Sequence, residues 1–382
     1  MKRTEVFALA LGLFFFSQAA RADWRPAKRI TWTSGWSEYP SMAVDPSGNP
    51  HVVWDDDTTG YSEVYYKGSS DGGATWTTAK RLSSTTAGCY RPDIAVDSSG
   101  ALHVVWYDFA PGDYEVYYRK SPDGGITWTT TKRITWTSGG SEYPAVAVDS
   151  SGNPHVAWME YTLGNYEIYY KKSTDGGTTW STAKRLTWTS ESSDEPALAV
   201  DSSGNPHVIW YDQAPGNFEI FYRKSMDGGA AWTPAKRLTW DSDGSWYPSI
   251  AVDSSDILHL AWENATVGSP EIYYKKSADG GTTWTPIKRL TWTSGLSGSP
   301  IIAVDSSGNP HIVWYDDTPG NYEIYYRAST DGGTMWTAAE RLTWASGGSY
   351  DPDMAPDPSG HIHVVWESNI PGNMEIFYKK SK

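Results

Sequence analysis

The feature that most constrains the fold of this chain is a 52-residue repeat. One series of tryptophans recurs at this spacing, at Trp24, Trp76, Trp128, Trp180, Trp232, Trp284 and Trp336. A second series has the same spacing, at Trp54, Trp106, Trp158, Trp210, Trp262, Trp314 and Trp366. The units align without an insertion or a deletion, so the chain repeats one structural unit seven times.

Each unit contains four segments with the composition of β-strands. In the unit from Trp128 to Asp175 they span residues 131–136, 144–149, 154–158 and 166–173, rich in Val, Ile, Tyr and Trp and separated by Gly, Pro, Ser and Asn. Four antiparallel strands repeated around an axis form a β-propeller blade. The sequence therefore predicts an all-β, seven-bladed β-propeller of four-stranded blades, apolar on both faces because each blade packs against two neighbours.

The frame of the repeat also predicts how the ring closes. The segment 26–32 has the sequence of a fourth, outermost strand, whereas the last unit stops at residues 379–382, after its third strand. We expect the N-terminal strand to complete the last blade, because this removes an open sheet edge.

The first 22 residues have the pattern of a secretory signal peptide. Lys2 and Arg3 are followed by an apolar run over 6–16 and by the small-x-small sequence Ala20-Arg21-Ala22. We expect cleavage near Ala22, a single propeller domain over residues 23–382, and export to the periplasm, the cell surface or the medium.

The charge of the chain argues against two classes of partner. The formal net charge of −14 becomes −16 when residues 1–22, with three basic residues and Glu5, are removed. Phosphate backbones and anionic lipids repel such a chain, so we expect neither nucleic acid binding nor membrane insertion. Cys89 is the single cysteine, so no internal disulfide is possible.

A second repeated motif follows the third strand of six units. It reads "SSDGGATW" at 69–76 and "STDGGTTW" at 173–180, and its aspartates are Asp71, Asp123, Asp175, Asp227, Asp279 and Asp331. The motif resembles the Asp-box, or BNR repeat, S-x-D-x-G-x-T-W of the sialidase superfamily, although Ala231 and Met335 replace its threonine. The resemblance implies that these aspartates are structural and lie on the face away from any active site.

The same resemblance implies a catalytic set that this sequence lacks. Sialidases use three arginines that clamp a carboxylate, a Tyr–Glu pair, an Asp acid/base and an early Phe/Tyr-Arg-Ile-Pro motif, and no such motif occurs here. Arginine recurs once per unit in the fourth strand (Arg29 to Arg341) and glutamate once in the third (Glu63 to Glu375), which predicts a cross-strand ion pair in every blade. Only Arg91 lies in a candidate site loop, so we assign no catalytic residue.

Seven of the eight histidines occupy one repeat position, from His51 to His363, each six residues after an aspartate. We expect an Asp–His hydrogen bond that braces a turn. Histidines spread one per blade are too dispersed to share a metal ion, and the segment 241–244 lacks the ligands of a calcium loop, so we expect no metal and no cofactor.

The units differ mainly in the two connections that share one face of the ring. We call this the variable face, and drift in unconstrained loops is the alternative explanation for it. The candidate ligand-binding residues on this face are Trp36, Glu38, Tyr39, Tyr90, Arg91, Tyr107, Asp108, Glu142, Tyr143, Asp194, Glu195, Tyr211, Asp212, Trp246, Tyr247, Tyr315, Asp316, Tyr350 and Asp351. At the entrance to these loops lie Trp32, Trp136, Trp188, Trp240, Trp292 and Trp344, which we expect to pack between blades or to line pockets between them.

Aromatic rings and carboxylates together suit a sugar, whose ring faces stack and whose hydroxyls donate hydrogen bonds. The leading hypothesis is an exported, lectin-like, carbohydrate-binding propeller with a glycan or polysaccharide partner. One alternative is a glycoside hydrolase that uses carboxylates such as Glu38, Glu142, Asp194 or Asp212, and another is a protein-interaction scaffold. One deep asymmetric pocket on this face would favour an enzyme, and several equivalent shallow sites would favour a lectin.

Overall fold

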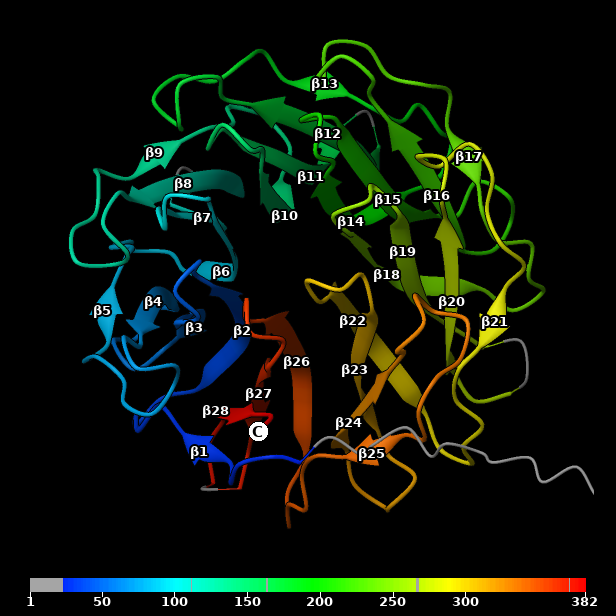
Figure 1. Cartoon of the computed structure of the whole chain (residues 1–382). Coiled ribbons are helices and arrows are strands. Elements are labelled where there is room, and N and C mark those ends of the chain that lie inside the picture. Colours follow the sequence, from blue (N-terminus) through cyan, green and yellow to red (C-terminus); the bar gives the residue numbers. More distant parts are fainter. Residues whose placement is uncertain (1–22, 111, 163, 266–267, 371) are drawn as a thin grey trace, which may run out of the picture.

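The computed structural model describes residues 23–382 except 111, 163, 266–267 and 371. These residues form seven antiparallel four-stranded sheets arranged radially around a central axis (Figure 1), which confirms the predicted seven-bladed propeller. The predicted signal peptide, residues 1–22, lies outside the described residues. In the part of the chain that is described, no helix has the length and apolar character needed to cross a membrane.

The first two strands of each blade are the inner ones. The innermost strands are β2 (Ser37–Val44), β6 (Cys89–Val96), β10 (Ser141–Val148), β14 (Ser193–Val200), β18 (Ser245–Val252), β22 (Ser297–Val304) and β26 (Ser349–Pro356). The second strands are β3 (Pro50–Asp56), β7 (Leu102–Asp108), β11 (Pro154–Thr162), β15 (Pro206–Asp212), β19 (Leu258–Asn264), β23 (Pro310–Asp316) and β27 (Ile362–Ser368).

The third and fourth strands form the outer half of each blade. The third strands are β4 (Glu63–Gly68), β8 (Glu115–Ser121), β12 (Asn165–Lys172), β16 (Glu219–Lys224), β20 (Glu271–Ser277), β24 (Glu323–Ala328) and β28 (Glu375–Lys380). The outermost strands are β5 (Lys80–Arg81), β9 (Lys132–Arg133), β13 (Lys184–Arg185), β17 (Lys236–Arg237), β21 (Lys288–Arg289), β25 (Glu340–Arg341) and β1 (Lys28–Arg29).

The outermost strands are much shorter than the predicted 131–136. In this blade the backbone N–H of Val116 donates to the hydroxyl of Thr135 at 2.8 Å instead of to a main-chain carbonyl. The ladder therefore continues through a side chain where backbone pairing ends.

The hydrophobic core lies between adjacent blades. One cluster joins Val53, Val64 and Tyr66 of the first blade to Val104 and Trp106 of the second. The tryptophans of the second strands are fully buried there, and Trp54 stacks on Tyr65 at 5.9 Å. Each blade is thus buried on both faces, as predicted.

This packing explains why another prediction is wrong. The series Trp32, Trp136, Trp188, Trp240, Trp292 and Trp344 does not pack between blades, because each side chain is 65–67% exposed. The space between the blades is already filled by the buried tryptophans of the second strands.

Repeated polar contacts fasten the outer strands. Each of the seven predicted Arg–Glu pairs is present, as for Arg185 and the fully buried Glu167 at 2.7 Å, and Thr189 N donates to the same carboxylate at 3.0 Å. The predicted Asp–His hydrogen bond is present in four blades, with His103 Nε2 3.4 Å from Asp97, and in the other three the two side chains lie 3.5–3.6 Å apart. The sequence did not reveal the third member of this contact, the hydroxyl of Tyr118, 2.8 Å from His103 Nδ1.

The Asp boxes form self-contained turns. Asp71 accepts hydrogen bonds from Thr75 N at 2.8 Å and from the hydroxyl of Ser69 at 2.7 Å. Gly73 has φ of 88°, and an added Cβ would lie 2.1 Å from the Tyr378 hydroxyl of the neighbouring blade. The turn therefore requires glycine and also contacts the next blade.

The ring closes as predicted. Strand β1 pairs with β28 through Lys28 and Arg29, opposite Tyr378 and Phe377, and Arg29 pairs with the buried Glu375. The N-terminal strand thus completes the blade whose other strands are C-terminal.

Deletion of residues 23–32 should strongly destabilise the fold. The deletion opens the edge of β28, leaves Glu375 buried without Arg29, and removes Ile30 from the core. Loss of one partner of a buried ion pair alone costs about 3–5 kcal/mol, so thermal denaturation should show a fall in Tm of roughly 5 °C or more. Trp32→Ser, a change at an exposed side chain of the same segment, is the control and should leave Tm nearly unchanged; an unchanged Tm in the deletion would refute this closure.

Candidate functional site at the channel mouth

Seven residues of the innermost strands form a ring at one end of the channel. They are Tyr39, Arg91, Tyr143, Glu195, Tyr247, Ser299 and Asp351, and each precedes a proline. In every blade the register of the first two strands shifts at this point, as between Glu38 and Ser41. The shift is a β-bulge, which redirects one side chain out of the regular alternation, here into the channel.

The ring residues share an uncommon backbone conformation. All seven have positive φ, between 40° and 50°. Non-glycine residues rarely adopt this region, so the surrounding sheet holds them there. The result is a ring of seven side chains of different chemistry on one rigid, repeated backbone.

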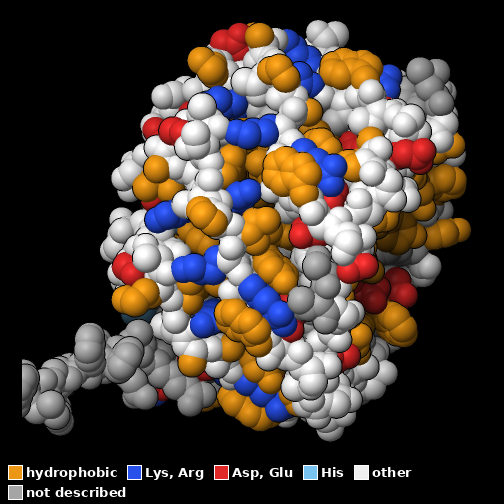
Figure 2. All heavy atoms as spheres, turned by 90° about the vertical axis from the view of Figure 1, so that its right-hand side faces the viewer, with side chains coloured by type: hydrophobic (Ala, Val, Ile, Leu, Met, Phe, Trp, Pro, Cys, Tyr) orange, Lys and Arg blue, Asp and Glu red, His pale blue; other side chains and the backbone are white. Residues whose placement is uncertain are grey.

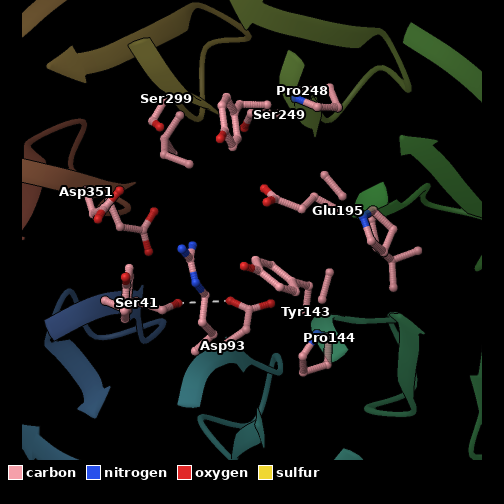
Figure 3. A pocket seen from close by; sticks show the side chains of 18 of the residues that line it. Ser41, Asp93, Tyr143, Pro144, Glu195, Pro248, Ser249, Ser299 and Asp351 are labelled. Atoms are coloured by element: carbon pink, nitrogen blue, oxygen red, sulfur yellow. Dashed lines mark hydrogen bonds between the residues drawn. The ribbon is translucent and has the colours of Figure 1, made fainter. Parts of the chain in front are cut away.

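The ring surrounds a single cavity of about 420 Å³, which falls in the size range of small-molecule sites. Figure 3 shows Tyr143, Glu195, Ser299 and Asp351 around this cavity, with Glu195 and Asp351 on opposite sides. The strands that carry them are β10, β14, β22 and β26.

Arg91 is the cation of the ring. Its guanidinium carbon lies 3.9 Å from the centre of the Tyr39 ring and 4.8 Å from that of Tyr143, within cation–π range. Burial opposes its charge, but Tyr143 and the carboxylates of Asp351 and Glu195 raise the pKa of Arg91 above its usual value. The arginine therefore remains charged and is held by two aromatic rings.

Glu195 is the carboxyl of the ring with the clearest change in acidity. Burial raises its pKa to about 7, and the nearby Arg91 opposes this rise. Tyr211, on the adjacent second strand, also opposes this rise in pKa. At neutral pH the mouth therefore contains Glu195 in both its protonated and its ionised form.

Carboxylates of the second strands hold the backbone of three ring residues. Tyr39 N donates to Glu367 at 2.7 Å, Arg91 N to Asp55 at 3.0 Å and Ser299 N to Glu263 at 3.0 Å. In each case the acceptor belongs to the preceding blade, so these contacts also join neighbouring blades. Burial raises the pKa of Asp55 to about 8 and that of Glu263 to about 7.

A second, lateral pocket adjoins the mouth. It has a volume of about 280 Å³ and is lined by Tyr315, Tyr322, Tyr350, Asp351, Glu367 and Met374. The rings of Tyr322 and Tyr350 lie 5.1 Å apart. Asp351 lines both cavities, so the mouth and the lateral pocket are neighbours.

Asp351 and Glu367 influence each other within this site. Burial raises the pKa of both carboxyls, and the charge of Asp351 further raises that of Glu367. Two adjacent acids in such surroundings favour states in which one of them keeps its proton.

The floor of the mouth is polar on one side. Ser41 donates to Asp93 at 2.9 Å, the bond drawn in Figure 3, and Asp353 accepts from Met42 N at 2.7 Å. Burial raises the pKa of Asp93 to about 6 and that of Asp353 to about 7. These acids join the last, first and second blades next to Arg91.

The structure brings many of the predicted residues together. Tyr39, Arg91, Tyr143, Glu195, Tyr247 and Asp351 line the mouth, and Tyr315 and Tyr350 line the lateral pocket. Tyr107 and Tyr211 lie behind the ring, where each contacts the following ring tyrosine at 5.9 Å. Glu38, Tyr90, Glu142, Asp194 and Trp246 occupy the residue before the bulge and lie opposite the second strands.

Other predicted residues lie outside the two pockets. Asp108, Asp212 and Asp316 are buried and accept hydrogen bonds within their own blades, as Asp212 does from Ser193 at 2.7 Å. Trp36 is exposed on a loop, where its backbone N–H donates to Asp57. A ligand in the mouth would therefore not contact these four residues.

Several site residues were missed by the sequence analysis. Tyr322 and Met374 precede the glutamate of the third strand, a position that also differs among the other blades (Ser62, Tyr114, Tyr166, Phe218 and Pro270). Comparison of the copies at this position would have revealed them. Asp93 and Asp353 occupy a position that other blades fill with Ser41, Ala145, Ala197, Ser249 and Ile301. Comparison of the seven repeats at this position would also have pointed to these two acids.

The site does not contain an arginine clamp. Arg91 is the single arginine among the residues that line the described mouth. Within the described ranges, no group of three or more His, Cys, Asp and Glu side chains is placed to hold a metal ion.

The fold and the repeat together identify the class of this protein. Residues 49–260, more than half of the chain, match the BNR repeat-like domain family. The chain belongs to this family, as the resemblance of its Asp boxes indicated. No curated protein matches it.

Solved structures share the propeller. A protein of unknown function from Dyadobacter fermentans DSM 18053 has a TM-score of 0.59 at 15% identity, over 93% of this chain and 99% of that chain. A PL25 ulvan lyase, a polysaccharide lyase solved with -[GlcA(1-4)Rha3S]-, has a TM-score of 0.63 at 10% identity over 92% and 95%. The intramolecular trans-sialidase from Ruminococcus gnavus has a TM-score of 0.50 at 15% identity over 91% and 94%. At these identities the likeness shows the fold alone.

Glu263→Gln should alter how stability depends on pH. The folded carboxyl has a pKa of about 7 against an ordinary value of 4.5, so its contribution to stability falls as pH rises through this window. Glutamine cannot ionise but can still accept the Ser299 N–H. The Tm of the variant relative to wild type should therefore rise between about pH 4.5 and about pH 8, by the equivalent of roughly 3 kcal/mol at most.

Thermal denaturation over this pH range measures the effect. Asp243→Asn, at an exposed carboxyl of the variable face, is the control and should show no such trend. A difference between Glu263→Gln and wild type that does not vary with pH would contradict the assignment.

Proposed function

We propose that this chain is a carbohydrate-binding propeller, and that the channel mouth and the lateral pocket bind neighbouring sugar residues of one glycan. The observation that carries the proposal is a pair of neighbouring cavities that share Asp351, one with three tyrosines in its lining ring and the other with three more. Tyrosine rings offer flat apolar surfaces with a polar edge, which suits the face of a pyranose ring.

The acidity of the site supports the same ligand class. Burial raises the pKa values of Glu195, Asp351 and Glu367, which favours the protonated form of these carboxyls more than water does. A protonated carboxyl donates a hydrogen bond and an ionised one accepts it, whereas sugar hydroxyls do both. Arg91 adds a cation that can bind ring oxygens, hydroxyls or a single carboxylate.

The structural neighbours add support from outside the chain. A polysaccharide lyase and a trans-sialidase, both proteins that act on carbohydrates, have this propeller. The similarity of these two structures to this chain supports a glycan-related function, in agreement with the tyrosines and carboxyls of its site.

Binding rather than catalysis fits the tyrosines best. Burial, and next the charge of Glu195, raise the pKa of Tyr211, which disfavours the phenolate that a nucleophile requires. With one arginine in the mouth, the carboxylate clamp of sialidases is also absent from the described site.

A glycoside hydrolase is the second candidate, and one observation favours it. The site is a single asymmetric cavity with a carboxyl, Glu195, whose pKa of about 7 suits a general acid. Turnover of aryl glycosides that is lost in Glu195→Gln would establish this activity. Of the other carboxylates considered, Glu142 accepts a hydrogen bond from Tyr166 at 2.9 Å.

Export is part of the proposal. The pattern of residues 1–22 supports cleavage near Ala22 and a function outside the cytoplasm, where polysaccharides are encountered. N-terminal sequencing of protein recovered outside the cytoplasm should begin at Asp23.

Asp351→Asn should reduce glycan affinity by at least about tenfold, because the residue lines both cavities and its amide keeps the volume but loses the charge. A glycan array followed by calorimetry on the best ligand measures the effect.

Asp243→Asn, on the same face but outside both pockets, is the matched control and should bind like wild type. Absence of binding to any glycan, or equal affinity in the two variants, would contradict the proposal. Co-purification of a protein partner instead would favour an interaction scaffold.

A further inference from the structure

The outer wall of the ring carries a second repeated surface that the channel mouth does not use. Its largest side chains are the six exposed tryptophans Trp32, Trp136, Trp188, Trp240, Trp292 and Trp344. Each follows an outermost strand by three residues, and each remains about two-thirds exposed. Tryptophan is rarely left so open without a partner, and here the same surface recurs blade after blade.

Basic side chains accompany these tryptophans. In every one of the six blades the arginine of the outermost strand lies 5.6–5.8 Å from the tryptophan ring, as Arg133 does from Trp136. In four of them a second cation, from the third strand of the next blade, lies 5.3–5.7 Å away, as Lys171 does from Trp136. We call each tryptophan with its neighbouring cations a rim station.

The two cations differ in how their charge is balanced. The arginine of a station pairs with a buried glutamate, as Arg133 does with Glu115. The second cation donates to a neutral main-chain carbonyl, as Lys67 does to Ile30 O and Lys171 to Ile134 O, both at 2.6 Å. A station of this kind therefore keeps about one positive charge beside an open aromatic ring.

The rim is basic although the chain as a whole is acidic. Apart from Arg25, Arg91 and Lys382, every lysine and arginine among the described residues lies on the third or the outermost strand of a blade. Figure 2 shows these basic side chains alternating with hydrophobic ones over the outer wall. The net charge alone predicted that polyanions would be repelled, but the cations are concentrated on one surface.

The first blade has no tryptophan at the station position, and the surface that the ring would cover is open there. Ser84 occupies the equivalent position of the first blade, and a groove of about 400 Å³ opens there between the first and second blades. Arg81 and Arg119, the equivalents of the two cations, both line it. The seventh station thus has its cations without its aromatic ring.

We propose that the rim stations bind an acidic polysaccharide, with tryptophan rings stacked on sugar rings and the cations paired with carboxylate or sulfate groups. Stations on successive blades would be occupied together by one long chain, so weak contacts would add up to useful avidity. Second cations beside four of the six rings suit a polymer of low charge density. Duplex DNA, with one charge per ~1.7 Å, would meet too few cations.

Binding to immobilised polymers tests the proposal. The probes are alginate, which carries carboxylates, carrageenan, which carries sulfates, neutral dextran, and duplex DNA. We expect binding to at least one of the two acidic polysaccharides, weakened by added salt because the contacts are partly ionic. Which of the two binds identifies the acidic group. Equal or tighter binding of dextran or DNA, or no binding of either acidic polymer, would overturn the proposal.

Three variants of the rim sharpen the test. The triple change Trp136→Ser, Trp188→Ser and Trp240→Ser repeats what the first blade already has at Ser84, so the fold should tolerate it. Loss of three stations should lower the apparent affinity at least about tenfold, whereas Ser84→Trp should add a station and raise it several-fold. The matched control is Ile126→Ser with Met226→Ser, which removes exposed apolar side chains from the Asp-box turns and should have no effect.

The results of the rim experiments can be told apart from the result of the Asp351→Asn experiment on the channel mouth. The rim proposal stands on other residues and does not depend on the proposed function above. If the triple variant binds acidic polysaccharide as tightly as wild type, with Tm unchanged, the rim is not the binding surface.

Discussion

The burial of every blade on both of its faces is the constraint on which this structure depends. The tryptophans of the second strands, such as Trp54 and Trp106, are covered in part by the neighbouring blade, so no blade has a finished core of its own. A stack of such blades is complete only when the last one meets the first. The pairing of β1 with β28 and the Arg29–Glu375 ion pair make that final contact.

Packing between the blades restricts the positions at which the seven repeat units can differ in sequence. Positions between the blades must repeat, because a change there affects two sheets. The bulge of the innermost strand is different, since its side chain points into the channel and not into the space between two sheets. The same left-handed backbone therefore carries Tyr39, Arg91, Glu195 or Asp351 in different blades. Sevenfold backbone symmetry is thus combined with a fully asymmetric site.

Charge is separated radially in this molecule. Lysine and arginine are concentrated on the outer strands, while carboxyls such as Asp93, Glu263 and Asp353 are enclosed near the axis, where burial raises their pKa values. Arg91 is the exception that places a cation at the centre. The mouth and the rim therefore differ in charge.

The sequence by itself determined the fold, the ring closure, the Asp-box turns and the cross-strand ion pairs, because a repeat of fixed length forces each strand and contact to recur. It also identified the variable face, since the copies could be compared with one another. The tertiary structure alone decided which variable residues meet. It separated Asp351, which lines two pockets, from Asp108, which is buried inside its blade, because a bulge and not the sequence spacing sets the direction of each side chain. It also decided that Trp136 and its equivalents face solvent, because only the packed blades show that the space between them is already filled.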